Sequence, residues 1–385
     1  MKIAVVGAGP IGSLLSLRLL QKNKEVVVFE EDEEPGIPAH CAGVVSLKTL
    51  RIYDLSFSQR FILNRFRGAY IFLPGGHVLH VARREYVACV IDRVSFDREL
   101  SFLAEKKGAA LMLGTRVEDL LLNRSKVLVK TGKRDFCVDK VYLCEGLSRT
   151  LTKKLASLKH RPLVGVNIDL EASTSFPEDH VCVFISKKVS DRLFAWLIPL
   201  NGGLVRLGLA ASSNVAKRLS YVIKYATAKG LIDSLRKISE SAGLVNVDGP
   251  LPRFSFLGDR VIVVGDAAGQ NKPTTGGGLY YGGLGALLAS QTTSGRDYEK
   301  AWWSVCGRDI KFMSIFRRVL DNLSDRDLEE MLKRIDLEEL SQLFSFRADF
   351  DRQSLVMRSL MDYLARQPLG SLLLILKSLI VSLLA

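Results

Sequence analysis

The chain has 385 residues, 48% of them hydrophobic, which is enough for two packed layers or two domains around a substantial core. Its formal net charge of +13 predicts attraction to anionic lipid headgroups, a phosphorylated substrate or an acidic electron carrier. No basic run is interleaved with aromatic residues, which argues against a nucleic-acid partner. The cysteines are scattered without CxxC spacing, so the pattern supports no zinc, iron–sulfur or disulfide framework.

The first thirty residues have the pattern of a dinucleotide-binding βαβ unit. An apolar strand leads into Gly7-Ala8-Gly9-Pro10-Ile11-Gly12, which is followed by an apolar helix and a second strand ending at Glu30. Gly7 permits the tight turn, Gly9 lets the backbone approach a pyrophosphate, and Gly12 lets the helix pack on the strand. The phosphates would lie at the positive end of this helix. Glu30, about 18 residues after Gly12, stands where an acid binds an adenosine ribose.

The next segments alternate between helical and strand patterns. An acidic, proline-rich loop over residues 31–39 precedes Cys41, and residues 94–107 have helical periodicity. Short alternating runs predict a small antiparallel insertion that ends in the apolar strand 140–144. These runs are residues 116–122, 126–130 and 135–138.

A second sheet is predicted in the middle of the chain, from the strand-like runs 163–170, 181–186, 193–199 and 204–210. Residues 215–230 predict a helix. The apolar run 260–264 has the length of a buried parallel strand and leads into Gly265-Asp266, so the nucleotide domain is expected to be discontinuous. From residue 296 the sequence is helical and strongly charged.

We therefore expect an α/β fold with a Rossmann-like FAD-binding domain, an inserted antiparallel-sheet substrate domain and a helical C-terminal region with an apolar end. The predicted parts are residues 1–155 with 246–295, residues 156–245, and residues 296–385. The apolar end, residues 369–385, would form a helix about 25 Å long, slightly short of the ~20 residues that span a bilayer. It fits a core helix, a helix inserted in a membrane interface, or a lid over an apolar substrate.

A glycine run opens the small-residue helix predicted to end near residue 291. Because Gly276, Gly277 and Gly278 lack side chains, their backbone N–H groups are free to face the O2/N1 edge of a flavin and stabilise its anionic reduced form. A plain flexible turn is the alternative, although Pro273 stiffens the approach. This downstream segment makes a flavin the better choice of dinucleotide.

The chemistry-bearing segments together resemble the geranylgeranyl reductase family, within the flavoprotein fold shared with aromatic hydroxylases. The resemblance extends from residue 3 to about residue 290 and is carried by the order and spacing of its motifs. These are the GxGxxG unit and segments 41–46, 92–97, 145–149, 195–199 and 265–278.

The resemblance implies FAD as the cofactor and a set of residues near it. In this set Asp266 accepts from a ribityl hydroxyl, although it also fits an N-cap of the next helix. Arg93 lies near the cofactor, where the sequence by itself suggests a surface salt bridge, and Gly146 is equally explained as a turn. The full predicted set is Gly7, Gly9, Pro10, Ile11, Gly12, Glu30, Ala42, Gly43, Arg93, Val117, Gly146, Asp266, Gly276, Gly277 and Gly278.

The resemblance also implies residues near the substrate. Cys41 is the candidate catalytic residue, positioning the substrate or helping to deliver a proton; a small buried hydrophobe is the alternative. Trp196 and Pro199 match a substrate-domain strand, with core packing as the alternative for the tryptophan. Tyr280 and Tyr281 cap the flavin pocket or simply pack. The chain departs from the family pattern at Phe194 and Leu200, where tyrosine and lysine are usual, so this strand is more apolar.

These implications predict an FAD-dependent reductase that saturates geranylgeranyl double bonds of membrane lipids or prenyl diphosphates. The alternatives are an FAD-dependent monooxygenase and an electron-transfer flavoprotein serving a membrane quinone. The electron donor is NADPH or reduced ferredoxin, since no second GxGxxG is present. Because the dinucleotide unit starts at residue 2, we expect no signal peptide and a cytoplasmic protein at the inner face of the cell membrane.

Overall fold

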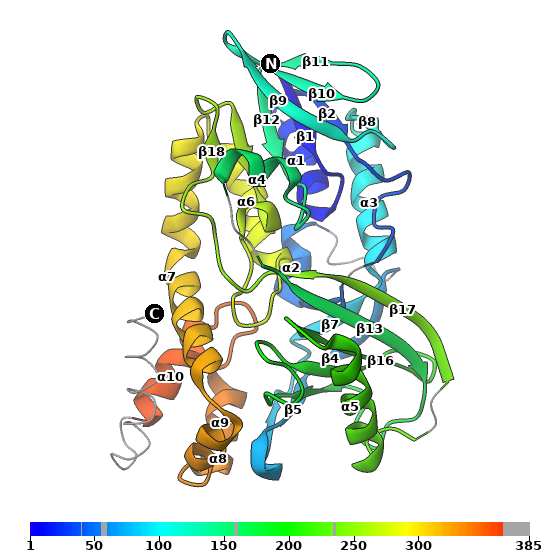
Figure 1. Ribbon diagram of the computed structural model, residues 1–385, viewed down its shortest axis with the longest axis vertical. Helices are drawn as coiled ribbons and strands as arrows, with labels where there is room; N and C mark the ends of the chain where they lie inside the picture. The colour runs from blue at the N-terminus through cyan, green and yellow to red at the C-terminus, as the bar shows by residue number, and fades with distance from the viewer. Residues whose placement is uncertain (40, 55–59, 158–160, 234–235, 365–385) are drawn as a thin grey trace.

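A computed structural model describes residues 1–39, 41–54, 60–157, 161–233 and 236–364 (Figure 1). A mostly parallel sheet occupies the upper part of the molecule in this view, and a long, mostly antiparallel sheet occupies the lower part. One long helix runs along the outer side of both parts. The predicted fold class, with a Rossmann-like core, separate antiparallel sheets and C-terminal helices, is confirmed.

The upper sheet has six strands in the order β18-β19-β12-β1-β2-β8. All neighbours are parallel except the edge pair β18–β19. The near-continuous apolar strands suit a parallel sheet buried on both faces. The strands are β1 (Lys2–Val6), β2 (Glu25–Phe29), β8 (Ala110–Met112), β12 (Lys140–Leu143), β18 (Ser255–Phe256) and β19 (Val261–Val263).

Helices that are far apart in the sequence pack together around this sheet. The N-terminal helix α1 contacts both α3 and α6, which are far from it in sequence. The predicted helices over 94–107 and up to residue 291 are confirmed as α3 and α6. The helices are α1 (Pro10–Leu20), α2 (Leu47–Ile52), α3 (Arg93–Lys106), α4 (Thr150–Ala156) and α6 (Leu279–Gln291), with a 3₁₀ turn, η2, at Gly265–Ala268.

Two small sheets flank the parallel one. The predicted antiparallel insertion is confirmed as the meander β9-β10-β11. The second small sheet, in the order β3-β7-β4, connects the upper and lower parts. The strands are β9 (Val117–Asn123), β10 (Lys126–Thr131), β11 (Phe136–Val138), β3 (Val44–Ser46), β7 (Ala88–Ile91) and β4 (Ile62–Phe66).

The lower sheet has seven strands in the order β17-β13-β16-β15-β14-β5-β6. The four predicted central strands are confirmed, and helix α5 (Val215–Ala228) packs on the face that holds Val166, Leu197 and Leu207. The strands are β13 (Leu163–Glu171), β14 (His180–Phe184), β15 (Ala195–Pro199), β16 (Leu204–Ala211), β17 (Arg236–Val245), β5 (Gly68–Phe72) and β6 (Val78–Ala82).

The predicted division into parts needs one correction. Residues 68–82 were assigned to the FAD-binding part, but β5 pairs in parallel with β14 and β6 pairs with β5, so both belong to the lower sheet. Short strands that pair across a large sequence separation leave no local signal of their partner. The return of the chain into β19, which pairs with β12, makes the upper sheet discontinuous, as predicted.

The C-terminal region is helical, as predicted, and polar caps start its helices. Ser294 caps the 28-residue α7, Ser324 forms a capping box with Asp327, and Asp336 caps α9. Across the described residues, no helix combines the length and the apolar character that crossing a bilayer requires. The apolar end predicted at 369–385 lies outside the described residues. The helices are α7 (Gly295–Asn322), α8 (Asp325–Leu332), α9 (Leu337–Arg347) and α10 (Ser354–Leu364), and a 3₁₀ turn, η1, spans Pro74–Gly76.

Candidate cofactor and substrate site

The GxGxxG turn uses its three glycines for different reasons. Gly7 has a φ of +102°, and a Cβ there would lie 2.4 Å from the Cys144 carbonyl oxygen. A Cβ on Gly12 would lie 1.9 Å from the Gly7 carbonyl oxygen. A Cβ on Gly9 would meet nothing within 4 Å. Gly7 and Gly12 are therefore required by the fold itself, whereas the space beside Gly9 is open to a ligand.

Glu30 is held beside this turn. Its Oε2 atom accepts a hydrogen bond from the Ala8 amide at 2.7 Å, and Oε1 accepts one from the Asp32 amide at 3.1 Å. Burial raises the pKa of the Glu30 carboxyl, and the two backbone donors only partly offset that effect. The side chain therefore has a fixed orientation at the end of β2, with acceptor capacity left for a ribose hydroxyl.

The neighbouring predicted positions are backbone contacts or packing contacts. Pro10 is the first residue of α1, and the Ile11 side chain lies against Gly265, where a Cβ would come within 3.0 Å of it. Gly43 has a φ of +84°, and its Cβ would lie 2.5 Å from the Ile91 carbonyl oxygen. Val117 is buried at the start of β9. Gly146 has a φ of +59° and open space on its Cβ side.

Asp266 holds an unsatisfied acceptor. Its Oδ1 atom is closed off from solvent and has no hydrogen-bond partner. Burial raises the pKa of this carboxyl, with Arg149 and Arg93 acting in the opposite direction. The predicted alternative, a helix N-cap, is not observed, because the N-cap of α6 is Gly278 and η2 has no side-chain cap. A buried acceptor without a partner fits a ligand hydroxyl such as the ribityl chain of a flavin.

Arg149 is a residue of this site that the sequence did not single out. It is 2% exposed, and its Nε and Nη2 atoms donate to the Asp266 carbonyl oxygen at 3.1 and 2.7 Å. The nearby Glu145 accepts from the amides of Leu151 and Thr152, so its carboxylate starts α4. The signal for Arg149 was its place at the end of the Glu145–Arg149 motif.

Each glycine of the 276–278 run is constrained by a close neighbour. Gly276 has a φ of +74°, and a Cβ there would lie 2.3 Å from the Val245 Cγ1 atom. A Cβ on Gly277 would lie 2.9 Å from the Lys272 side chain, and one on Gly278 would lie 2.3 Å from Asp266 Oδ1. The geometry therefore argues against a plain flexible turn and places the amide-bearing entry to α6 beside the unpartnered carboxylate.

A buried ion pair fixes the same loop to the C-terminal region. Lys272 Nζ lies 3.2 Å from Asp351 Oδ1, and the two side chains are 5% and 1% exposed. Ser46 Oγ donates to Asp351 Oδ2 at 2.5 Å, and the Tyr281 hydroxyl donates to the Asp351 carbonyl oxygen at 2.9 Å. Residues near position 351 therefore belong to the wall of this site, which no sequence motif had indicated.

Tyr281 and Tyr280 occupy different environments. Tyr281 is 1% exposed within the hydrophobic core, where burial raises its pKa, so packing is its role in this structure. Tyr280 is half-buried, and burial raises its pKa to about 12. Its ring meets that of Tyr281 edge to face. Tyr53, missed at the sequence level, donates to the Leu279 carbonyl oxygen at 2.7 Å and tethers the start of α6.

Cys41 lies where the upper and lower parts meet. Its sulfur accepts from the Gly43 amide at 3.4 Å, and the Arg93 guanidinium lies close enough for an electrostatic interaction with it. Arg93 pairs with Asp97 at 2.9 Å, so the predicted salt bridge exists, but it is largely buried. Burial lowers the pKa of Arg93, yet Asp97 and Cys41 raise it more, so the group stays cationic.

A second guanidinium approaches Cys41 from the lower sheet. Arg206 on β16 donates to the Ala42 carbonyl oxygen at 3.0 Å, and its Nε and Nη2 atoms donate to Asp169 at 2.7 and 2.9 Å. Arg206 and Asp169 are direct partners across β16 and β13. No local pattern predicts this pair, because the two residues come together only through strand pairing.

On the predicted substrate strand, Trp196 points to the same face of the sheet as Arg206, whereas Pro199 points to the opposite face together with its partner Val205. Trp196 donates from Nε1 to Asn167 Oδ1 at 3.0 Å and lies over Gly208, where a Cβ would come within 2.5 Å of the indole nitrogen. Pro199 is buried, and its carbonyl oxygen accepts from Asn64 at 3.1 Å. The half-buried Trp196 therefore stands beside the polar row of Asn167, Asp169 and Arg206 rather than in the apolar core under α5.

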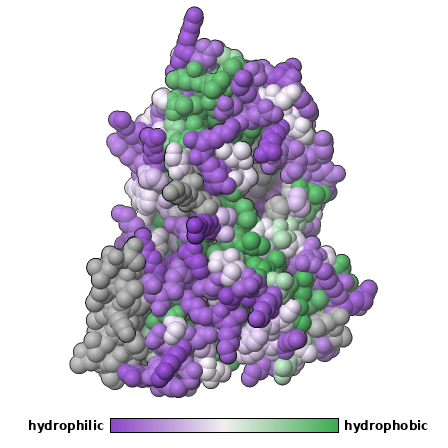
Figure 2. All heavy atoms as spheres, in the orientation of Figure 1, coloured by the Kyte–Doolittle hydropathy of each residue, from purple (hydrophilic) through white to green (hydrophobic). Residues whose placement is uncertain are grey.

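Apolar residues gather between the two parts of the molecule, over the neighbouring ends of β13 and β17 (Figure 2). Val164 and Leu244 are direct partners there and are 39% and 46% exposed. An exposed apolar pair at the junction of two domains is a suitable contact for a hydrophobic ligand.

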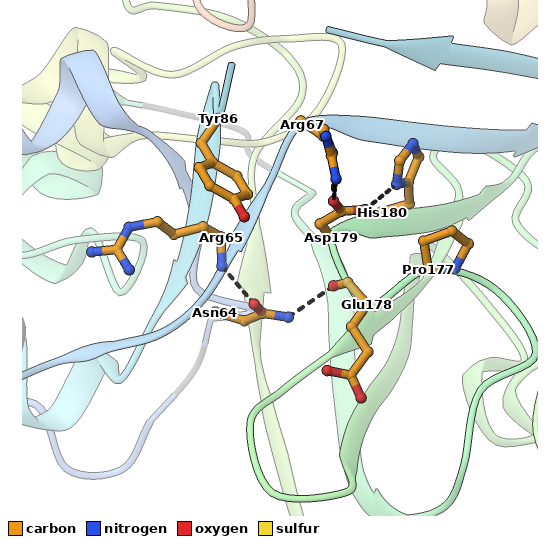
Figure 3. A pocket seen from close by; sticks show the side chains of 8 residues that line it. All are labelled: Asn64, Arg65, Arg67, Tyr86, Pro177, Glu178, Asp179 and His180. Carbon is orange, nitrogen blue, oxygen red and sulfur yellow. Dashed lines mark hydrogen bonds and ion pairs between the residues drawn. The ribbon is translucent and has the colours of Figure 1, made fainter. Parts of the chain in front are cut away.

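A separate hollow of about 410 Å³ opens at the start of β14 (Figure 3). Arg67 forms an ion pair with Asp179, and the His180 Nδ1 atom lies 2.6 Å from Asp179 Oδ1. Asn64 Nδ2 donates to the Glu178 carbonyl oxygen at 2.9 Å. The acids of this hollow offset its guanidinium groups, so it favours neither an anion nor a cation.

The residues around the first site fit an FAD molecule. The fit rests on the open space beside Gly9 and Gly146 and on the unpartnered Asp266 Oδ1. It also rests on the constrained glycines 276–278 at the start of α6. Among the described residues, no group of His, Cys, Asp and Glu side chains has the arrangement of a metal site.

Comparisons with known proteins agree with this geometry. The chain is 27% identical to digeranylgeranylglycerophospholipid reductase 1 of Methanococcoides burtonii, over 88% of this chain and 89% of that protein. It is 26% identical to an uncharacterized protein of Methanocaldococcus jannaschii, over 91% and 92% of the two chains. The crystal structure of a geranylgeranyl bacteriochlorophyll reductase-like protein from Thermoplasma acidophilum superposes with a TM-score of 0.80 at 20% identity, covering 99% and 98% of the two chains. No protein-family model matches the chain. The predicted family resemblance is confirmed.

Proposed function

We propose that this chain, which is related along most of its length to the geranylgeranyl reductase family, is an FAD-dependent reductase that saturates prenyl double bonds. The substrates are geranylgeranyl chains of membrane lipids or of prenyl diphosphates. One observation of the structure carries the proposal. The Cys41 thiol lies beside Arg93 and near Arg206, where the glycine-lined cofactor site meets the substrate sheet.

The chain's own residues would hold the cofactor in four places. Backbone near Gly9 accommodates the pyrophosphate, and the fixed Glu30 carboxylate accepts from the adenosine ribose. Asp266 Oδ1 accepts from the ribityl chain, and the amides at Gly276–Gly278 stabilise negative charge on the ring. When bound, reduced FAD supplies a hydride to one alkene carbon.

The substrate side has to orient the alkene, exclude water and provide a proton for the other alkene carbon. Cys41 is placed to orient the alkene or to take part in proton delivery. Arg206 holds the Cys41 loop through the Ala42 carbonyl oxygen. Trp196 contributes to the wall of the substrate cavity, and Pro199 supports the same strand from the opposite face of the sheet. The exposed pair Val164–Leu244 offers an apolar edge to a long prenyl chain.

The electron donor in this proposal is NADPH or reduced ferredoxin, and the net charge of +13 suits an acidic carrier protein. The same charge suits a peripheral position at the inner face of the cell membrane, where the substrate lipids reside.

The test is single-turnover reduction by purified protein. The protein is loaded with FAD, reduced chemically without oxygen, and mixed with a digeranylgeranylglycerophospholipid in detergent. Mass spectrometry should show the gain of one H₂ per saturated double bond. Cys41→Ser should keep FAD but lose most of the turnover, whereas Cys137→Ser, at an exposed thiol on β11, should keep both.

Three outcomes would count against the proposal. A reduced, FAD-loaded protein that leaves every prenyl chain intact would refute reductase activity. Substrate-stimulated oxygen consumption would favour a monooxygenase, and oxidation by quinone would favour an electron-transfer flavoprotein. Full turnover by Cys41→Ser would show that the Cys41 thiol is not needed for the reaction, and it would not contradict the reductase assignment.

A further inference from the structure

The outer face of helix α7 carries three exposed apolar side chains. Val305, Phe312 and Ile315 are 52%, 38% and 50% exposed. Their spacing of seven and three residues puts them on one side of the helix. In Figure 1 this helix runs along the outer side of the molecule. Large apolar residues grouped on one exposed helix face indicate a contact surface rather than isolated surface variation.

Cations alternate with these apolar residues on the same face. Lys300, Arg308, Lys311 and Arg318 are all exposed. Among the described residues, none of the four cations forms an ion pair with an acid. The acids nearest them in sequence are engaged elsewhere: buried Asp309 pairs with Arg352 at 3.3 Å. The face is therefore both cationic and apolar.

A shallow hollow lies along one edge of the face, on the side of the helix away from Val305 and Phe312. Its volume is about 590 Å³, and its walls are Trp303, Gly307, Arg308 and Lys311. Gly307 lets the indole pack close to the helix backbone, because a Cβ there would come 2.8 Å from the Trp303 Cε3 atom. Arg308 and Lys311 therefore border an open hollow, which leaves room for a phosphate group beside them.

We propose that this face of α7 binds the surface of an anionic lipid bilayer. Arg308 and Lys311 would contact lipid phosphates while Val305, Phe312 and Ile315 enter the boundary of the acyl chains. The inference deepens the proposed function and rests on it for the nature of the substrate, since an enzyme that acts on membrane lipids has to reach them at the bilayer.

Two other occupants fit less well. The apolar C-terminal segment, residues 365–385, contains no aspartate or glutamate, so it offers the four cations no opposite charge. A second copy of the chain related by a two-fold axis would bring the same cations against each other. An anionic bilayer complements both the apolar and the charged side chains.

The test is cosedimentation of the FAD-loaded protein with phosphatidylcholine vesicles, with and without phosphatidylglycerol. Binding is expected only to the anionic vesicles and should weaken with salt, because the Debye length falls. Arg308→Gln/Lys311→Gln should lower the partition coefficient roughly thirtyfold, at about fivefold per cation. Phe312→Asn/Ile315→Asn should lower it roughly tenfold or more.

The matched control is Lys106→Gln/Lys107→Gln at the exposed end of α3, which changes the net charge by the same amount. It should bind like the wild type. Equal loss in this control, or failure of the wild type to bind, would overturn the proposed surface. Retained binding in Phe312→Asn/Ile315→Asn would overturn the apolar contact. Cosedimentation measures binding and does not depend on turnover. A protein that reduces prenyl lipid in detergent but does not bind vesicles would therefore refute only this membrane-binding surface.

Discussion

The cofactor side and the substrate side of the candidate site are specified in different ways. On the cofactor side, the decisive positions are glycines whose missing side chains make room for backbone, as at Gly7 and Gly12. On the substrate side, the decisive features are side chains joined across strands, as in Arg206 with Asp169. The glycines of the cofactor side depend on spacing within a short segment, whereas the pairs of the substrate side depend on the register of a sheet. Substitutions should therefore act through backbone strain on one side and through lost polar contacts on the other.

The largest effect is expected where a Cβ meets backbone. Gly12→Ala should destabilise the protein by about 3 kcal/mol, because its Cβ would lie 1.9 Å from the Gly7 carbonyl oxygen and the turn has to move. Gly9→Ala should leave the stability of the FAD-free protein nearly unchanged and still abolish FAD binding. Urea unfolding and flavin fluorescence measure the two quantities. Equal loss of stability in both variants would contradict the distinct roles of these glycines.

The next effect concerns the side-chain contact that joins the two sides. Arg206→Met should destabilise the protein by about 2 kcal/mol, because Asp169 loses a charged, two-point partner. It should also release the Cys41 loop from its hydrogen bond to the Ala42 carbonyl oxygen. A maleimide should then react faster with Cys41, relative to the exposed Cys137 in the same protein. An unchanged ratio of the two rates would show that Arg206 does not position the loop.

The contrast between the two sides also explains what could be predicted from the sequence. The parallel sheet, its discontinuity and the glycine turn followed from local patterns, since each depends on residues close in the chain. The role of Asp266 was implied only by the family resemblance. The pairing of β5 with β14 did not follow from local patterns, because short strands carry no mark of their partner. Arg206, Asp169 and Asn167 were missed for the same reason. Asp351 was missed because it reaches the site from a charged helical region with no motif.

The buried carboxylate of Asp266 should make the free energy of unfolding of the FAD-free protein depend on pH. Burial raises the pKa of Asp266, so between its ordinary value and the raised one the folded state binds more protons than the unfolded state. The free energy of unfolding should therefore fall as pH rises through this window. Glu30 acts in the same direction through burial.

Asp266→Asn tests this contribution directly. The variant should be more stable than the wild type by about 1 kcal/mol above the window and should lose part of the pH slope, because no buried charge remains. It should bind FAD roughly tenfold more weakly, since a neutral acceptor makes a weaker hydrogen bond than a carboxylate. Unfolding titrations at several pH values, with Glu30 intact, give the slope. Equal FAD affinity in the variant and the wild type would contradict the predicted contact between Asp266 and the ribityl chain.

The smallest effect is expected from a single neutral hydrogen bond on the substrate sheet. Trp196→Phe should destabilise the protein by about 1 kcal/mol, because Asn167 is 4% exposed and its Oδ1 atom would lose its indole donor. Trp196→Phe/Asn167→Leu should recover most of this loss, since removing both partners leaves no buried polar atom unpaired. Unfolding measurements on the two single variants and the double variant give the coupling energy. If Trp196 also lines the prenyl cavity, Trp196→Phe should raise KM while kcat stays near the wild-type value. An unchanged KM would show that Trp196 only stabilises the sheet and does not contact the substrate.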